Sequence, residues 1–298
     1  DTHPALAVVE LMRLLMDREK LGWEEAWELT RRCIGYTNHT VLPEALEHWP
    51  VVLFERLLPR HLQILYEINA RFLAEVRAVW PGDEARVQRV SLFSETPEKQ
   101  VRMAHLAVVG SSAVNGVAEL HTRILRERVF RDFAEMWPDR FHSVTNGITP
   151  RRWLLKANPG LATLITDTIG SAWITDLDAL RALEPWANDE EFLMRFRAVK
   201  QANKKTLAAL IRTELGLAVS TTSLFDVLVK RLHEYKRQLL LGLYLVVLYN
   251  RLRADPHMDL HPRTFIIAGK AAPGYVMAKR IIRFLHAVAE AFNRTPGL

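Results

Sequence analysis

The chain is 298 residues long, with a hydrophobic fraction of 49% and a charged fraction of 25%, a composition typical of one large or two ordinary soluble globular domains. The net charge of +6 permits an anionic ligand. Positive and negative residues alternate along the chain, however, and do not form the basic arm that would indicate binding to nucleic acid. The one cysteine, Cys33, excludes an internal disulfide and suits a reducing cytoplasm, and the longest apolar run, Leu239 to Tyr249, is too short to cross a membrane.

The first part of the chain is predicted to be mostly helical. Asp1 or Thr2 precedes Pro4 as a candidate N-cap, and apolar residues then recur every three or four positions. The same spacing predicts three helices, over residues 6–18, 23–34 and 59–78.

A polar segment lies between the second and third of these helices. Residues 36–44 read Tyr-Thr-Asn-His-Thr-Val-Leu-Pro-Glu, and Pro43 predicts a loop or the end of a strand. Polar side chains on a loop between rigid elements are often those that bind ligands. His39 is therefore a candidate binding residue, against the alternative that it is structural or solvated.

The segment 144–153 marks the predicted boundary between two domains. It contains an Asn-Gly pair at Asn146 and a Thr-Pro pair, and both are typical of loops. Helical periodicity dominates before this segment, whereas helices to about Leu215 and then a strand–helix pattern follow it. We therefore predict an α/β protein with domains over residues 1–145 and 146–298.

The strand–helix pattern contains a turn rich in cations. Residues 223–229 predict a buried strand, and residues 239–249 predict a buried helix. Ligands of open α/β sheets bind outside the carboxyl ends of strands, where a helix N-terminus favours anions. The turn therefore predicts an oxyanion site, with phosphate the first candidate, against the alternative of a solvated basic turn. Its cations are Lys230, Arg231, Lys236 and Arg237, with His233 and Tyr235 among them.

A second strand, a glycine-rich turn and the start of a helix are predicted over residues 263–275. This turn matches neither the P-loop pattern nor the GxGxxG pattern, so a nucleotide site is not indicated.

The basic turn resembles a segment of a known family. Lys-Arg-Leu-His-Glu-Tyr-Lys-Arg-Gln at 230–238 is similar to the segment of α-glucan phosphorylases (glycogen, starch and maltodextrin phosphorylases) that holds the cofactor phosphate and the substrate phosphate. The resemblance covers essentially the whole chain and implies a partial, two-domain GT-B-type glycosyltransferase fold. Residues 1–145 would be the helix-rich end of the N-terminal domain, and residues 146–298 the first part of a Rossmann-like domain that binds pyridoxal phosphate. Further matching segments are Asp-Thr-His-Pro at 1–4, Tyr-Thr-Asn-His-Thr-Val-Leu-Pro-Glu-Ala-Leu-Glu at 36–47 and Leu-Leu-Pro-Arg-His-Leu-Gln at 57–63.

The resemblance also implies a reaction. Phosphorylases of this family convert α-1,4-glucan and orthophosphate into glucose 1-phosphate and a shortened glucan. They use pyridoxal 5'-phosphate through its phosphate group and not as an electron sink. A phosphate with a second pKa of about 6 can exchange a proton with the substrate phosphate, which protonates the glycosidic oxygen.

The resemblance assigns sugar-side roles in the first half of the chain. The residue matching His39 hydrogen-bonds the 6-hydroxyl group of the glucosyl unit, and its backbone carbonyl faces the anomeric carbon, where positive charge develops. Asn146 matches a second ligand of the 6-hydroxyl group, and Asp1 lies near the sugar through water. Asn115 and Val117 line or support the same pocket.

The basic turn carries the phosphate-side roles. Lys230 matches a residue that holds the cofactor phosphate, while Arg231 and Lys236 match residues that hold the substrate phosphate. Tyr235 lies near the sugar, and His233 orients its neighbours. The implied catalytic residues are therefore His39, Arg231, Tyr235 and Lys236, without a metal.

Two further aromatic residues match family positions. Trp153 alone would be assigned to a core, but the resemblance puts it near the pyridoxal ring. Tyr275 matches an aromatic that stacks on planar inhibitors near the mouth of the active site.

One family motif is missing from the sequence. Phosphorylases bind pyridoxal phosphate covalently through the lysine of a Gly-Thr-Gly-Asn-Met-Lys motif, which does not occur here. We therefore expect an internal piece of a homodimeric phosphorylase that alone is inactive, poorly stable and prone to pair at exposed sheet edges. The alternative is a non-catalytic glucan-binding or interaction fragment. A glycosyltransferase that uses a nucleotide sugar is disfavoured, because nothing in the sequence resembles its nucleotide-sugar site.

Overall fold

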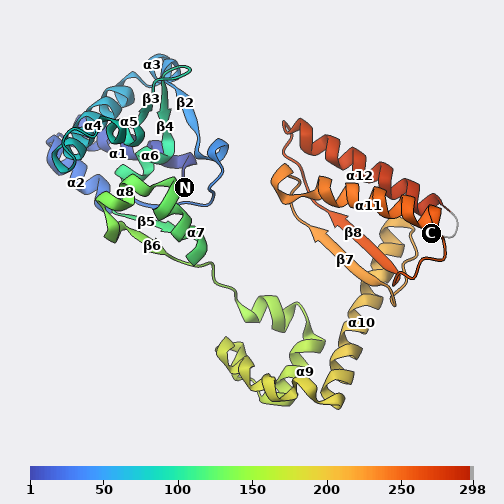
Figure 1. The fold of residues 1–298 in the computed structure, drawn as a ribbon. Coiled ribbons are helices and arrows are strands. Elements are labelled where there is room, and N and C mark those ends of the chain that lie inside the picture. Colours follow the sequence, from blue (N-terminus) through green and yellow to red (C-terminus); the bar gives the residue numbers. More distant parts are fainter. Residues whose placement is uncertain (296–298) are drawn as a thin grey trace. The chain divides into compact units, whose positions relative to one another are not determined.

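The computed structural model describes residues 1–295, and its contacts divide the chain into two compact units, Asp1–Ile148 and Thr149–Leu298 (Figure 1). Residues 296–298 of the predicted second domain lie outside the described residues. Both units combine helices with parallel strands, which confirms the predicted α/β class. The assignment of a sugar-side domain and a cofactor-binding domain stays a prediction.

The long helices of the first unit begin and end close to their predicted positions. The predicted helix over residues 59–78 is α4, which has Pro59 at its first position, where a missing N–H costs nothing. Its buried side chains, Leu62 and Leu65 among them, recur every three or four residues, so one stripe of the helix faces the core. The helices of this unit are α1 (Ala7–Arg13), α2 (Trp23–Cys33), α3 (Val51–Leu57), α4 (Pro59–Val79), α5 (Glu84–Val90), α6 (Met103–Val109), α7 (Glu119–Ile124) and α8 (Arg131–Met136).

Two three-stranded sheets lie among these helices. One is parallel with the order β1-β5-β6, in which the buried Val114 pairs with Tyr36 and Phe141; the other is antiparallel with the order β2-β4-β3. The sequence predicted a helix-rich segment here and did not predict the sheets, because such short strands show no two-residue alternation. The strands are β1 (Gly35–Thr37), β2 (His48–Pro50), β3 (Phe93–Ser94), β4 (Gln100–Arg102), β5 (Ala113–Gly116) and β6 (Phe141–Ser143).

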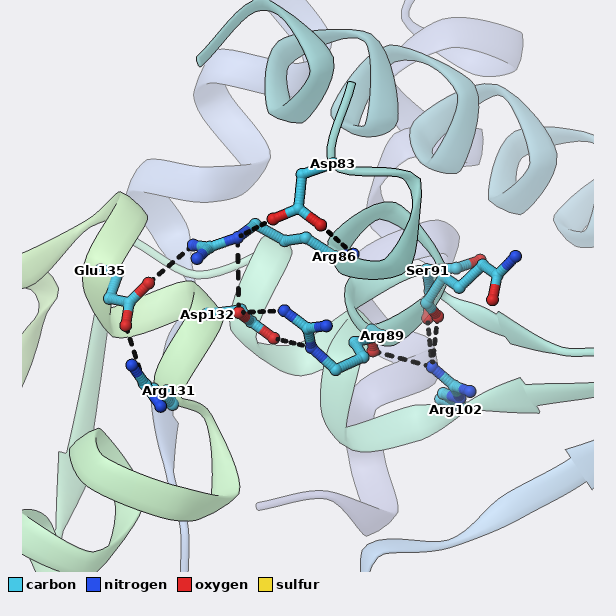
Figure 2. A network of polar contacts seen from close by, with 9 residues as sticks. Asp83, Arg86, Arg89, Ser91, Arg102, Arg131, Asp132 and Glu135 are labelled. Atoms are coloured by element: carbon cyan, nitrogen blue, oxygen red, sulfur yellow. Dashed lines mark hydrogen bonds and ion pairs between the residues drawn. The ribbon is translucent and has the colours of Figure 1, made fainter. Parts of the chain in front are cut away.

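A network of ion pairs joins α5 to α8 (Figure 2). Arg86 Nη1 lies 2.7 Å from Glu135 Oε2. Arg89 Nε lies 2.8 Å from Asp132 Oδ2. The guanidinium group of Arg86 also lies over Trp80, 4.1 Å from the ring centroid. Because the side chain of Arg86 is only 14% exposed, this network is better shielded from solvent than an ordinary surface ion pair.

The second unit begins with helices and ends with a strand–helix pattern, as predicted. Helix α10 ends at Leu215, because Gly216 adopts a left-handed φ of 68°. At its other end, Asp189 Oδ1 accepts the Phe192 N–H at 2.7 Å and caps the helix. The elements are α9 (Pro159–Ile169), α10 (Glu190–Leu215), β7 (Leu224–Val229), α11 (Gln238–Ala254), β8 (Arg263–Ala268) and α12 (Val276–Arg294).

Strands β7 and β8 form a parallel pair, in register from Leu224 opposite Arg263 to Val229 opposite Ala268. Helix α11 connects them and packs against α12 (Figure 1). A Cβ on Gly242 of α11 would overlap the ring of Phe284 on α12, so the glycine permits this close approach. Because the two strands are parallel and in register, the turns that follow their carboxyl ends lie next to each other.

The predicted burial of this region was wrong. Val227 of β7 is 57% exposed and Leu240 of α11 is 59% exposed, whereas Leu245, on another side of the helix, is buried. A parallel sheet is normally covered on both faces, and too little of the described chain packs over this two-stranded pair to cover these side chains. Despite this apolar surface, none of the helices within residues 1–295 has both the length and the apolar character of a membrane span.

Candidate functional site

Predicted sugar-side residues follow the carboxyl ends of the parallel strands in the first unit. His39 follows β1, Val117 follows β5 and Asn146 follows β6. Carboxyl ends of neighbouring parallel strands meet at one edge of a sheet, where ligands of α/β proteins bind. The loop after β6 contacts the end of β5 there, since the Val144 N–H donates to the carbonyl of Gly116, the last residue of β5, at 3.1 Å. His39 and Asn146 are both exposed at this edge.

The loop that carries His39 is held by the buried side chain of Asn38. Asn38 is 1% exposed, and its backbone N–H donates to the Asn115 carbonyl at 2.9 Å. Its Nδ2 donates to Tyr36 Oη at 3.1 Å, and its Oδ1 accepts the Thr40 N–H at 3.0 Å. Both neighbours of His39 are therefore fixed, while His39 itself is exposed.

Helix α7 contributes a residue that the sequence did not single out. His121 Nε2 lies 2.9 Å from Asn38 Oδ1, and His121 Nδ1 accepts the Val117 N–H at 3.0 Å. Burial lowers the pKa of His121, and the nearby His39 lowers it further. His121 is thus a neutral imidazole that joins the loops after β1 and β5. No motif marks it in the sequence, where 83 positions separate it from Asn38.

The N-terminal residues reach the same loop through Thr2. Thr2 Oγ1 lies 2.7 Å from Tyr36 Oη, and Thr2 is 3% exposed. Of the two predicted N-cap candidates, Thr2 holds the N-cap position of the following 3-10 helix, His3–Leu6. Its hydroxyl makes no capping hydrogen bond, because it contacts Tyr36 instead. The exposed Asp1 therefore lies next to a residue that is tied to the His39 loop.

In the second unit, the basic turn follows β7 directly. Lys230 and Arg231 are exposed, and the buried Leu232 anchors the turn. The Leu232 N–H donates to the Lys270 carbonyl at 2.9 Å, so the turn after β7 is bonded to the turn after β8. A Cβ on Gly269 would overlap the Lys230 carbonyl oxygen, and a glycine is therefore required for this approach.

Tyr275, which was predicted separately, forms one aromatic cluster with His233 and Tyr235 of this turn. The ring centroid of His233 lies 4.3 Å from that of Tyr235 and 5.0 Å from that of Tyr275. Tyr275 Oη donates to Glu234 Oε2 at 2.6 Å, and Lys236 Nζ lies 4.4 Å from the centroid of Tyr235. The structure thus brings the predicted inhibitor-stacking residue Tyr275 against His233 and Glu234 of the basic turn.

The cations of the basic turn suit a phosphate group. Within residues 1–295, none of Lys230, Arg231 and Lys236 forms an ion pair with a carboxylate. Helix α11 begins directly after the turn, and Gln238 Nε2 donates to the Arg231 carbonyl at 3.0 Å, which fixes the turn to the helix start. A guanidinium fork, two ammonium groups and a helix N-terminus together fit the phosphate of a substrate or of a cofactor.

Trp153 lies at the start of the second unit, in the π-helical segment Arg151–Lys156. Its side chain is 65% exposed, so the core position suggested by its residue type alone was wrong. Its place near a pyridoxal ring stays a prediction.

Comparison with known proteins assigns a family to this arrangement. The model of the carbohydrate phosphorylase family matches residues 1–298. The chain is 54% identical over 296 residues to the muscle form of glycogen phosphorylase from Ovis aries and 53% identical over 296 residues to the brain form from Bos taurus, with 99% of this chain covered in both cases. It is 53% identical over 298 residues, its full length, to the muscle form from Homo sapiens.

The chain spans 35% of the length of each of these relatives. The family match nevertheless runs from its first residue to its last, and the predicted resemblance is confirmed. This chain belongs to the carbohydrate phosphorylase family.

Proposed function

We propose that this chain is part of a longer α-glucan phosphorylase and contributes to its active site. The reaction transfers a glucosyl unit from an α-1,4-glucan to orthophosphate and yields glucose 1-phosphate. The observation that carries the proposal is the basic turn. Its exposed cations lack carboxylate partners within residues 1–295 and lie outside the end of a parallel strand, in a chain 53% to 54% identical to proteins named glycogen phosphorylase.

On the phosphate side, Arg231 and Lys236 bind orthophosphate, and Lys230 binds the phosphate of pyridoxal 5'-phosphate. The planar fork of Arg231 matches two phosphate oxygens, whereas the lysines act as point charges. When bound, the cofactor supplies a phosphate with a second pKa of about 6, which can donate and accept a proton near neutral pH. Trp153 packs near the pyridoxal ring, and Tyr275 stacks on planar inhibitors.

On the sugar side, His39 and Asn146 bind the 6-hydroxyl group of the glucosyl unit, and Asp1 contacts the sugar through water. The backbone carbonyl of His39 faces the anomeric carbon. This carbon becomes positively charged in the transition state, so a fixed dipole aimed at it lowers the barrier. Tyr235 lies near the sugar, and His233, whose ring contacts that of Tyr235, orients its neighbours.

The intact protein in this proposal is a cytoplasmic homodimer of two-domain GT-B-type fold. The chain alone is inactive, because the Gly-Thr-Gly-Asn-Met-Lys motif does not occur in it. The second candidate is a glucan-binding protein without catalysis, which would keep the sugar-side residues but form no glucose 1-phosphate.

Phosphorolysis by the full-length protein that carries this chain tests the proposal. We expect glucose 1-phosphate from glucan and orthophosphate, and a loss of about 100-fold or more in kcat/KM for Arg231→Ala, because one charge-assisted phosphate contact contributes a few kcal/mol. Lys205→Gln is the matched control, since Lys205 is an exposed cation on α10 outside the basic turn. Glucan binding without phosphorolysis would support the second candidate, and equal activity of the Arg231 variant would contradict the proposed phosphate site.

A further inference from the structure

His121 uses both ring nitrogens at the carboxyl edge of the first sheet. Its Nε2 lies 2.9 Å from Asn38 Oδ1, and its Nδ1 lies 3.0 Å from the Val117 nitrogen. The Asn38 atom is an oxygen, because the Thr40 backbone N–H also donates to it at 3.0 Å and a backbone N–H cannot face another donor. His121 therefore donates through Nε2 and accepts through Nδ1, which fixes its tautomer.

We propose that His121 is a positioning residue for His39 and that it acts through Asn38. The inference rests on the proposed function, in which the His39 carbonyl faces the reacting carbon. Asn38 and Thr40 flank His39, and the Asn38 amide oxygen binds the Thr40 N–H. The hydrogen bond from His121 holds this amide from outside the loop, on helix α7.

The burial of these groups makes the contact costly to lose. Asn38 is 1% exposed, and its Nδ2 already donates to Tyr36 Oη. If His121 no longer donates, the shielded amide oxygen keeps only the contact within its own loop. The peptide groups on both sides of His39 can then reorient with it. A displacement of about 1 Å at a reacting group can cost about 100-fold in rate.

A purely structural role for His121 makes a different prediction. In that case the bond to Val117 would matter as much as the bond to Asn38, because both join the loops to α7. Two substitutions can remove the two hydrogen bonds one at a time. In His121→Gln, the amide nitrogen reaches about as far as Nε2 and keeps the donor to Asn38. In His121→Asn, the amide oxygen reaches about as far as Nδ1 and keeps the acceptor for Val117.

Steady-state kinetics of the full-length protein carries the first test. His121→Gln should keep kcat within about 3-fold of the wild-type value, whereas His121→Asn should lower kcat by about 10- to 100-fold. The KM for orthophosphate should change little in either variant, because the cations that bind it lie on the basic turn of the second unit.

Hydrogen exchange measured by mass spectrometry provides a readout independent of activity. His121→Asn should accelerate exchange in a peptide over residues 38–42, and His121→Gln in a peptide over residues 115–121. Each variant thus removes one of the two hydrogen bonds that the imidazole makes: His121→Asn the bond to Asn38, and His121→Gln the bond to Val117.

The outcomes separate the inference from the proposed function. Wild-type kcat in His121→Asn, or unchanged exchange over residues 38–42 in that variant, would overturn the role of His121 and leave the phosphorylase proposal intact. A wild-type protein that forms no glucose 1-phosphate would contradict the proposed function, and the exchange data would then decide whether His121 holds the His39 loop.

Discussion

The carbonyl oxygen of Lys230 lies so close to Gly269 that a Cβ on Gly269 would overlap it. This contact binds the turn after β7 to the turn after β8, and it sets the backbone position of the first cation in the basic turn. The geometry of the candidate phosphate site therefore depends on Gly269, which has no side chain to bind a ligand.

Gly269→Ala should displace the basic turn. We expect a loss of about 1–3 kcal/mol in the free energy of unfolding, as for other overpacked sites, and a higher KM for orthophosphate in the full-length protein. Gly274→Ala is the control, because no atom lies within 4 Å of the Cβ it would add. Urea unfolding and phosphorolysis measure the two effects. Equal values for both variants would contradict the close contact.

Asp132→Asn should weaken the joint between α5 and α8 in Figure 2. Its hydrogen bond with Arg89 lowers the pKa of Asp132, so the ionised carboxylate stabilises the folded state above its unfolded pKa of about 3.9, and this contribution is lost as pH falls through the lower folded pKa. We expect a loss of about 1–2 kcal/mol at pH of about 7 that shrinks toward a pH of about 3. Urea unfolding at several pH values measures it, with the exposed Glu127→Gln as control. A deficit that does not depend on pH would contradict the account.

His105 should make the chain less stable in mild acid. Its Nδ1 donates to the Ser91 carbonyl at 3.0 Å, and burial, followed by the charge of Arg102, lowers the pKa of His105 to about 4. The unfolded chain binds this proton first, near a pH of about 6.5, so stability is complete above that value and declines by up to about 3 kcal/mol as pH falls toward the folded pKa.

His105→Asn provides the comparison for this titration. The variant keeps a donor for Ser91 but cannot be protonated, and it loses the ring contact with Phe133 at 5.0 Å. It should therefore be less stable than the wild type at neutral pH, with a smaller decline in the urea midpoint between pH values of about 7 and 5. Parallel declines in the two proteins would show that His105 does not titrate in this way.

Leu240→Gln should reduce self-association of the chain without loss of stability. Leu240 is 59% exposed beside other apolar side chains of α11, and such surfaces promote association. Leu245→Gln on the same helix is the buried counterpart and should destabilise the chain by about 2–5 kcal/mol. Light scattering and urea unfolding measure the two effects. Unchanged self-association of the Leu240 variant would mean that the exposed apolar surface of α11 does not mediate it.

Sequence reasoning succeeded where structure is local. The helix over residues 59–78 was predicted to within a residue of α4, because its apolar stripe repeats over several turns. The basic turn was also predictable, since strand, turn and helix follow one another in sequence. The strand β1 was too short to be recognised, and the burial of β7 depends on what packs over it.

The contacts around His39 could not be predicted from the sequence for another reason. The bond between Asn38 and His121 joins residues 83 positions apart, and neither residue belongs to a recognisable spacing. Such a pairing follows only from the parallel order of β1 and β5, which brings the two loops to one edge. The family roles of the site residues came from resemblance, and they stay predictions.

The most direct measurement is the intact mass of this chain after incubation with pyridoxal 5'-phosphate and borohydride reduction, together with an assay for glucose 1-phosphate from glucan and orthophosphate. The account predicts an unmodified mass of 34.2 kDa and no product, because the groups proposed to bind phosphate and sugar are in this chain but the motif lysine is not. Stoichiometric pyridoxylation with product formation would contradict it, because a lysine of this chain would then carry the cofactor.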